Sequence, residues 1–149
     1  MNDLENLIDD DGLRISYCAG KSDKLVVVFS GVGTKRFEQP RIEMFNAATQ
    51  HLQHHALFVT DANRSWLNAP GQDVLIASAA AQVVAQLSPA SVTLLGNSMG
   101  GTQALLLSNL IPCTSVLAFS PQFSIHPNVV PEELRWMYFR RKIRHFTYP

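Results

Sequence analysis

Residues 92–100, Val-Thr-Leu-Leu-Gly-Asn-Ser-Met-Gly, decide the fold that we predict for this chain. The first four residues of this stretch are β-branched or aliphatic, which is typical of a strand buried on both faces of a parallel sheet. Gly96 ends this run, and from Met99 onward apolar residues recur at helical spacing. A strand that passes into a helix with almost no linker must turn sharply, and the residue at the apex is pushed toward positive φ. The sequence therefore predicts a strand–turn–helix unit with Ser98 at its apex.

The residues of this turn also suggest a chemical role. Gly96 and Gly100 relieve the crowding on either side of Ser98, and Gly101 lets the new helix pack close to the sheet. We expect the Ser98 hydroxyl to project above the edge of the sheet. The backbone N–H of Met99, at the helix N-terminus, would then point to where an oxyanion could form. The G-x-S-x-G pattern in this context predicts a nucleophilic serine.

The length and composition of the chain favour one globular domain. With 149 residues, of which 46% are apolar, residues 1–149 are long enough to bury a core as a single unit. No apolar run is long enough for a membrane span, and the N-terminus is neither basic nor apolar, so we expect neither a membrane span nor a signal peptide. A cytoplasmic location follows from this. Cys18 and Cys113 match no metal or redox spacing, and we expect no metal and no cofactor.

The net charge of zero conceals an asymmetry along the chain. All twelve acidic residues lie at or before Glu133, whereas the last fifteen residues carry five positive charges and no negative one. A basic tail of this kind could contact nucleic acid or an anionic membrane surface. We favour the alternative, a solvated helix whose Trp136, Phe139 and Ile143 turn inward, and we expect no nucleic-acid partner.

The order of predicted elements indicates the architecture. Strands are predicted over residues 13–18, 24–29, 56–60, 92–95 and 115–119, and helices from about 41 to 52, from Asp73 as the cap to 87, from 99 to 110 and from 132 to 144. Strands that alternate with helices favour a three-layer αβα sandwich around a mostly parallel sheet. The loops at residues 30–34, 61–71 and 96–101 would then converge at the carboxyl edge of this sheet, where ligands bind in such folds.

At this point the chain resembles the α/β-hydrolase family, in particular its serine esterases and lipases. The resemblance covers residues 13 to about 120, the N-terminal two-thirds of such a domain. It rests on the turn around Ser98 and on the buried strand that leads into residues 30–33, Ser-Gly-Val-Gly. It implies that Ser98 attacks a small-molecule ester or related acyl substrate. It also implies that the N–H groups of Met99 and of Gly31 or Val32 hold the oxyanion, with Gly31 favoured because a small residue lets a substrate approach the backbone.

The resemblance also implies an acid and then a histidine after the serine, and the sequence departs from this order. After Ser98 the acids are Glu132 and Glu133, and the histidines are His126 and His145. Glu133 and His145 lie near the two ends of one predicted helix, roughly 18 Å apart at about 1.5 Å per residue. His126 follows the last predicted strand at its carboxyl end and is our candidate base. We expect an incomplete hydrolase domain, truncated at its C-terminus, that turns over esters feebly or not at all.

Candidate substrate contacts lie in the loops beside the serine. Val32, Asp61, Arg64 and Trp66 could contact a polar or anionic substrate. The alternatives are that Asp61 caps an Asx turn and that a buried Trp66 pins a surface loop.

Two other functions compete with the hydrolase interpretation. Residues 31–33 and Asp61 imitate a dinucleotide-binding fold, but Arg36 occupies the place of its third glycine. A non-catalytic α/β module that binds a partner is the second alternative. An unpaired edge strand at Ser115–Phe119 would offer such a partner chain a surface for pairing.

Overall fold

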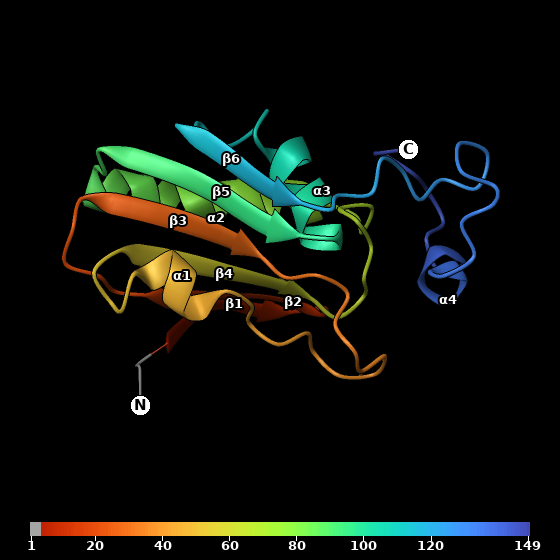
Figure 1. The fold of residues 1–149 in the computed structure, drawn as a ribbon, viewed down its shortest axis with the longest axis horizontal. Helices are drawn as coiled ribbons and strands as arrows, with labels where there is room; N and C mark the ends of the chain where they lie inside the picture. Colours follow the sequence, from red (N-terminus) through yellow and green to blue (C-terminus); the bar gives the residue numbers. More distant parts are fainter. Residues whose placement is uncertain (1–3) are drawn as a thin grey trace.

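A computed structural model describes residues 4–149 and shows a six-stranded sheet with helices on both faces (Figure 1). The strands are β1 (Leu4–Asp10), β2 (Leu13–Cys18), β3 (Lys24–Phe29), β4 (His55–Asp61), β5 (Ser91–Asn97) and β6 (Ser115–Phe119). The helices are α1 (Phe45–Thr49), α2 (Gln72–Leu87), α3 (Met99–Leu107) and α4 (Met137–Arg140). The strand order is β1-β2-β4-β3-β5-β6. Strands β4, β3, β5 and β6 are parallel to one another, and β2 pairs antiparallel with both of its neighbours, β1 and β4. The predicted mostly parallel sheet and three-layer architecture are confirmed.

The apolar core is divided between the two faces of the sheet. Leu25, Val27 and Phe29 of β3 pack into a cluster with residues of α2 and α3. Val26 and Val28 point to the opposite face, into a cluster with Phe45 of α1 and its neighbours. Because successive side chains of a strand alternate between faces, a strand covered on both sides needs an unbroken apolar run. The central position of β3 therefore explains its sequence.

The N-terminal strand β1 was not predicted. Its residues are mostly exposed and polar, and it pairs with β2 at the edge of the sheet. Asp11 and Gly12 join the two strands, both with positive φ. Two such residues form the tight turn that suits a β-hairpin, and an Asp-Gly pair is a strong sequence signal for it. This pair could have revealed the strand.

Two predicted helices are much shorter in the structure. The helix expected after Pro40 is confined to α1, since Met44 before it and residues 50–52 after it have positive φ. The helix expected over residues 132–144 is confined to α4. The start of α2 also differs, because Gly71 takes the N-cap position with φ 71° and Asp73 lies in the first turn. The Asp73 carboxylate accepts hydrogen bonds from the Val74 N–H and the Tyr148 hydroxyl.

The segment after β6 lies beyond the carboxyl ends of the parallel strands (Figure 1). Its Trp136, Phe139 and Ile143 pack around Val32 and Trp66 from the loops that leave β3 and β4. The predicted inward orientation of these three side chains is confirmed, but the packing does not require one continuous helix. No helix among residues 4–149 is long and apolar enough to cross a membrane.

Candidate active site

Ser98 forms the apex of a sharp turn between β5 and α3. Its φ of 56° and ψ of −121° place it in a region that residues with side chains rarely adopt. Two main-chain hydrogen bonds hold this conformation. The Ser98 N–H donates to the Phe119 carbonyl of β6 over 2.8 Å, and the Ser98 carbonyl accepts from the Thr102 N–H of α3 over 3.1 Å. The strained turn predicted from the sequence is therefore present and is held by the elements on both sides.

Close backbone approaches explain two glycines of the motif. A Cβ on Gly96 would lie 2.1 Å from the Gly100 carbonyl oxygen, and a Cβ on Gly100 would lie 1.9 Å from the Phe29 carbonyl oxygen. Neither distance is compatible with a side chain. At Gly101 the nearest atom, the Phe119 carbonyl oxygen, would be 3.1 Å away, which is a milder crowding. The glycines on either side of Ser98 are thus required by the packing of α3 against the ends of β3 and β5.

The sheet topology brings the loop after β3 next to Ser98. The strand that follows β3 in sequence, β4, lies on one side of β3 in the sheet. The next two strands, β5 and β6, lie on its other side, so the direction of strand addition reverses at β3. Parallel sheets bind ligands at such a switch point, outside the carboxyl ends of the strands. A Cβ on Gly31 would lie 3.6 Å from the Ser98 Cβ. Gly31 therefore adjoins Ser98, and its N–H at present donates to the Glu43 carboxylate over 3.3 Å.

Gln122, which was not predicted as a site residue, is the side-chain partner of Ser98. Its Nε2 donates to Ser98 Oγ over 2.8 Å, and its Oε1 accepts from Trp66 Nε1 over 3.1 Å. Its carbonyl accepts a hydrogen bond from the Thr102 hydroxyl. Because the indole N–H can only donate, it must face the amide oxygen, so the amide nitrogen faces Ser98. An amide in this position can donate a hydrogen bond but cannot take up the serine proton. Its place three residues after the end of β6, at the carboxyl edge of the sheet, was the sequence signal for it.

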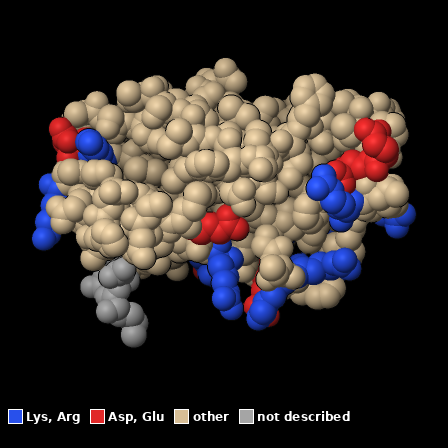
Figure 2. All heavy atoms as spheres, in the orientation of Figure 1, with Lys and Arg blue, Asp and Glu red and all other residues tan. Residues whose placement is uncertain are grey.

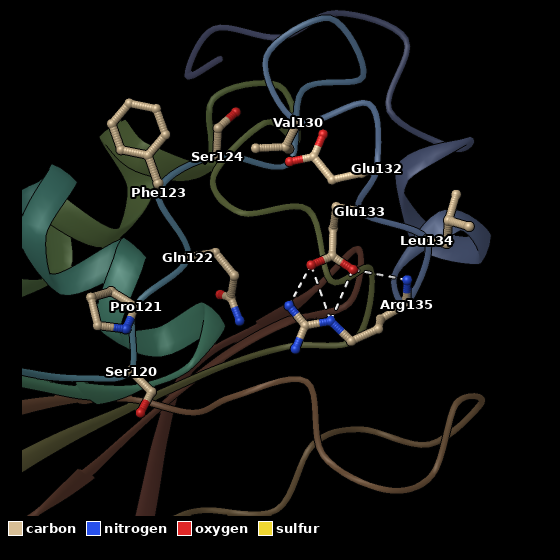
Figure 3. A pocket seen from close by; sticks show the side chains of 10 residues that line it. All are labelled: Ser120, Pro121, Gln122, Phe123, Ser124, Val130, Glu132, Glu133, Leu134 and Arg135. Atoms are coloured by element: carbon tan, nitrogen blue, oxygen red, sulfur yellow. Dashed lines mark hydrogen bonds and ion pairs between the residues drawn. The ribbon is translucent and has the colours of Figure 1, made fainter.

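A cavity of about 500 Å³ is lined by Gln122 and its neighbours after β6, and by Val130 and residues 132–135. Figure 3 shows Gln122 on one side of this cavity, with Glu133 and Arg135 on the other. Glu133 accepts hydrogen bonds from both the backbone and the guanidinium of Arg135, which hold the pKa of the Glu133 carboxyl below its usual value. The cavity thus has a wall that is shared with the Ser98 site.

The structure does not bring the three candidate triad residues together. The His126 ring packs edge-on against Phe146, with the ring centroids 4.6 Å apart, and its Nδ1 accepts the Asn128 N–H. Glu133 lines the cavity beside Gln122, whereas His145 lines a different cavity. Within residues 4–149, none of these three side chains forms a hydrogen bond with Ser98.

Asp61 and Arg64 organise the loop that follows β4. The Asp61 carboxylate accepts hydrogen bonds from the Asn63 and Ser65 N–H groups and from the Ser65 hydroxyl. Arg64 is 1% exposed and donates to the carbonyls of Val32, Lys35, Glu38 and Ala62. Burial lowers the pKa of Arg64, and the nearby Asp61 charge partly offsets this. Both candidate substrate residues are therefore bound to the protein itself in this structure.

Val32 and Trp66 are also buried, in one apolar cluster with Met99. Trp66 has a φ of 50°, and its neighbours Arg64 and Leu67 also have positive φ. Such conformations persist only where the surroundings hold them in place. This rigid loop presents the Trp66 N–H to Gln122, so Trp66 reaches the site through Gln122.

Comparisons with known proteins agree with this geometry at the level of the fold. No family model and no curated protein matches the sequence. Among solved structures, the chain is similar to the capsule O-acetyltransferase of Neisseria meningitidis serogroup A, with a TM-score of 0.65 and 18% identity over 92% of this chain and 58% of that one. It is also similar to an esterase from Pyrococcus furiosus, with a TM-score of 0.58 and 14% identity over 94% and 61% of the two chains. A third is the bacterial brefeldin A esterase, with a TM-score of 0.52 and 17% identity over 89% and 44%.

The chain spans less than two-thirds of the length of each of these proteins. The resemblance to the α/β-hydrolase family that the sequence indicated is thus confirmed for the architecture, and the chain has the α/β-hydrolase fold.

Proposed function

We propose that this protein is a serine hydrolase-like acyl-transfer protein in which Ser98 is the nucleophile for an ester or related acyl substrate. The observation that carries this proposal is the strained conformation of Ser98, with φ 56° and ψ −121°, between β5 and α3. A backbone held in such a conformation raises the serine hydroxyl above the edge of the sheet.

In the proposed reaction, Ser98 Oγ forms a bond to the carbonyl carbon and its proton passes to a base. The protonated base then gives this proton to the leaving alcohol as its bond to the carbonyl carbon breaks. Water or a second alcohol, deprotonated by the same base, releases the acyl group from Ser98. The N–H of Met99 at the start of α3 and the N–H of Gly31 would hold the tetrahedral oxyanion. In related chemistry, the loss of one such donor lowers the rate by about 100-fold to 1000-fold.

Among residues 4–149, no histidine or carboxylate side chain forms a hydrogen bond with Ser98. Ser98 Oγ accepts a hydrogen bond from Gln122, which cannot take up its proton. Of the two histidines after Ser98, His126 lies on the segment that follows Gln122, and we propose it as the base. This role requires His126 to leave its present contacts with Asn128 and Phe146. We therefore expect slow ester turnover by this chain.

The similar structures support acyl chemistry of two kinds. Two of them are esterases, in which water accepts the acyl group, and one is an O-acetyltransferase. Acyl transfer of either kind can proceed through an acyl-enzyme intermediate at a nucleophilic residue. Formation of a covalent adduct at Ser98 is the step that this proposal requires.

A fluorophosphonate probe tests this step directly. We expect labelling of the wild-type chain at Ser98, identified by peptide mass spectrometry, and none in Ser98→Ala. Hydrolysis of p-nitrophenyl acetate should be slow and should be lost in the same variant. A folded chain that shows no labelling at Ser98 would instead support the alternative, a non-catalytic α/β module that binds a partner.

A further inference from the structure

The Glu43 carboxylate occupies the oxyanion side of the proposed site. Its Oε2 accepts the Gly31 N–H over 3.3 Å, and its Oε1 lies 3.4 Å from the point where a Cβ on Gly31 would be. The Ser98 Cβ lies 3.6 Å from the same point. A carboxylate therefore contacts Gly31, the proposed oxyanion donor, and Gly31 in turn adjoins Ser98.

One N–H group cannot serve this carboxylate and an oxyanion at once. The Gly31 amide has a single proton, so a substrate must displace Glu43 before Gly31 can stabilise negative charge on the substrate oxygen. A carboxylate that stayed close would also repel the developing oxyanion, and this repulsion is stronger in a partly buried site than in water. Glu43 therefore inhibits the proposed reaction as long as its carboxylate accepts the Gly31 N–H.

Glu43 also has a place to move to. Among residues 4–149, it takes part in none of the three ion pairs, which join Arg14 with Asp9, Lys35 with Glu38 and Arg135 with Glu133. It lines a cavity of about 320 Å³ whose wall includes Lys35 and the exposed Arg41. A carboxylate that leaves the Gly31 N–H can turn toward these cations without leaving the loop that precedes α1.

We propose that Glu43 controls access to the oxyanion position of this site: its carboxylate occupies the Gly31 N–H in the resting protein and excludes anionic ligands from it. This inference rests on the proposed function for its catalytic consequence. The exclusion of anions from Gly31 is independent of any reaction at Ser98. The two can therefore be tested separately.

The first experiment measures the Gly31 amide without any chemistry at Ser98. In the Ser98→Ala background, we expect removal of the carboxylate by Glu43→Ala to shift the Gly31 amide proton resonance upfield, because a hydrogen bond to a carboxylate is lost. Titration with sodium acetate should then move this resonance in Ser98→Ala/Glu43→Ala and leave it unmoved in Ser98→Ala alone. Glu38→Ala, which removes a carboxylate from the same loop, is the matched control and should behave like the background.

The second experiment measures the rate of fluorophosphonate labelling at Ser98. Since a hydrogen bond to a charged group is a comparatively strong one, we expect labelling to be about tenfold faster in Glu43→Ala than in the wild type. Glu43→Gln keeps the size of the side chain and removes its charge, so it should give an intermediate rate. Glu43→Gln also allows the same comparison with the wild type if the alanine variant is poorly folded.

The outcomes separate the inference from the proposed function. If the wild type is labelled but neither Glu43 variant is faster, or if acetate moves the Gly31 resonance equally with and without Glu43, the role of Glu43 is refuted and the role of Ser98 stands. If no variant is labelled but the acetate response depends on Glu43, the proposed function fails. The conclusion that Glu43 excludes anions from the Gly31 N–H then still stands.

Discussion

Gln122 donates a hydrogen bond from Nε2 to Oγ of Ser98 over 2.8 Å, and the Trp66 indole fixes the direction of this donation. The serine hydroxyl is therefore an acceptor in the resting site. An oxygen that accepts a hydrogen bond is a weaker nucleophile than one whose proton is being removed. The Glu43 carboxylate accepts the Gly31 N–H in the same way. The serine hydroxyl and the proposed oxyanion donor are therefore both hydrogen-bonded to side chains of the protein.

Gln122→Glu should activate Ser98. One carboxylate oxygen would keep the Trp66 N–H, and the other would face the Ser98 hydroxyl and could accept its proton. General-base assistance by a weakly basic carboxylate is expected to accelerate fluorophosphonate labelling by roughly 100-fold. Because only the ionised carboxylate accepts the proton, labelling of this variant should increase as the pH rises through roughly 4 to 5, the range in which a glutamate ionises.

Gln122→Met is the matched control, because it has a similar length but can neither donate strongly nor accept the proton. We expect no acceleration in this variant. Equal labelling rates for the glutamate and methionine variants would show that a carboxylate at position 122 does not accept the serine proton.

Gly100→Ala should destabilise the protein by roughly 3 kcal/mol, since its Cβ would lie 1.9 Å from the Phe29 carbonyl oxygen. The backbone of β3 or α3 would have to shift. Gly101→Ala is the matched control one residue along α3, with a nearest approach of 3.1 Å, and should change the stability by less than about 1 kcal/mol. Urea denaturation of the two variants measures the difference, and similar midpoints would contradict the steric explanation.

The hydroxyl of Tyr148 should lose its proton at a higher pH than an ordinary tyrosine does. It donates to the Asp73 carboxylate over 2.6 Å, and this hydrogen bond, aided by burial and the charge of Asp73, raises the pKa of Tyr148 to about 12. The folded pKa lies above the value of about 10 for a tyrosine in an unfolded chain. The contribution to stability is therefore fully present below pH 10 and is lost as the pH rises through 12.

Difference absorbance between the wild type and Tyr148→Phe isolates this titration. We expect the pKa to fall toward about 10 in Asp73→Asn, which removes the charge. The stability of Tyr148→Phe should depend less on pH between 10 and 12 than that of the wild type. A Tyr148 that titrates near pH 10 in the folded wild type would refute the contact.

The exposed edge of β6 should support association with another chain. Between Asp73 and Glu132 the sequence contains no Asp, Glu, Lys or Arg, and the surface over β5 and β6 carries no charged side chain (Figure 2). Leu117 and Phe119 are about half exposed, at 50% and 54%. An uncharged, apolar strand edge lacks the features that prevent pairing between sheets.

Leu117→Lys should therefore weaken concentration-dependent association in sedimentation velocity. Leu75→Lys is the matched control, because Leu75 is 49% exposed on α2, away from the sheet edge. If both substitutions reduce association equally, general surface hydrophobicity is responsible and edge pairing is not.

Local patterns in the sequence were enough to predict the turn at Ser98 and the sheet beneath it. A strand buried on both faces needs an unbroken apolar run, and a sharp turn into a helix needs glycines, so both requirements are visible in a few consecutive residues. The hairpin of β1 was missed although Asp11 and Gly12 indicate it. Of the helix predicted over residues 132–144, the structure contains only α4, and the aromatic residues of this segment pack against loops that are distant in sequence.

The partners of the reactive groups could not be predicted in this way. Gln122 reaches Ser98 because β6 lies beside β5, and Glu43 reaches Gly31 because the segment before α1 folds back over the end of β3. The sequence thus determined the nucleophile and the backbone that strains it, since both depend on neighbouring residues. Only the tertiary structure decided which side chains hold the Ser98 hydroxyl and the Gly31 N–H, because hydrogen bonds between distant residues depend on strand order and loop packing.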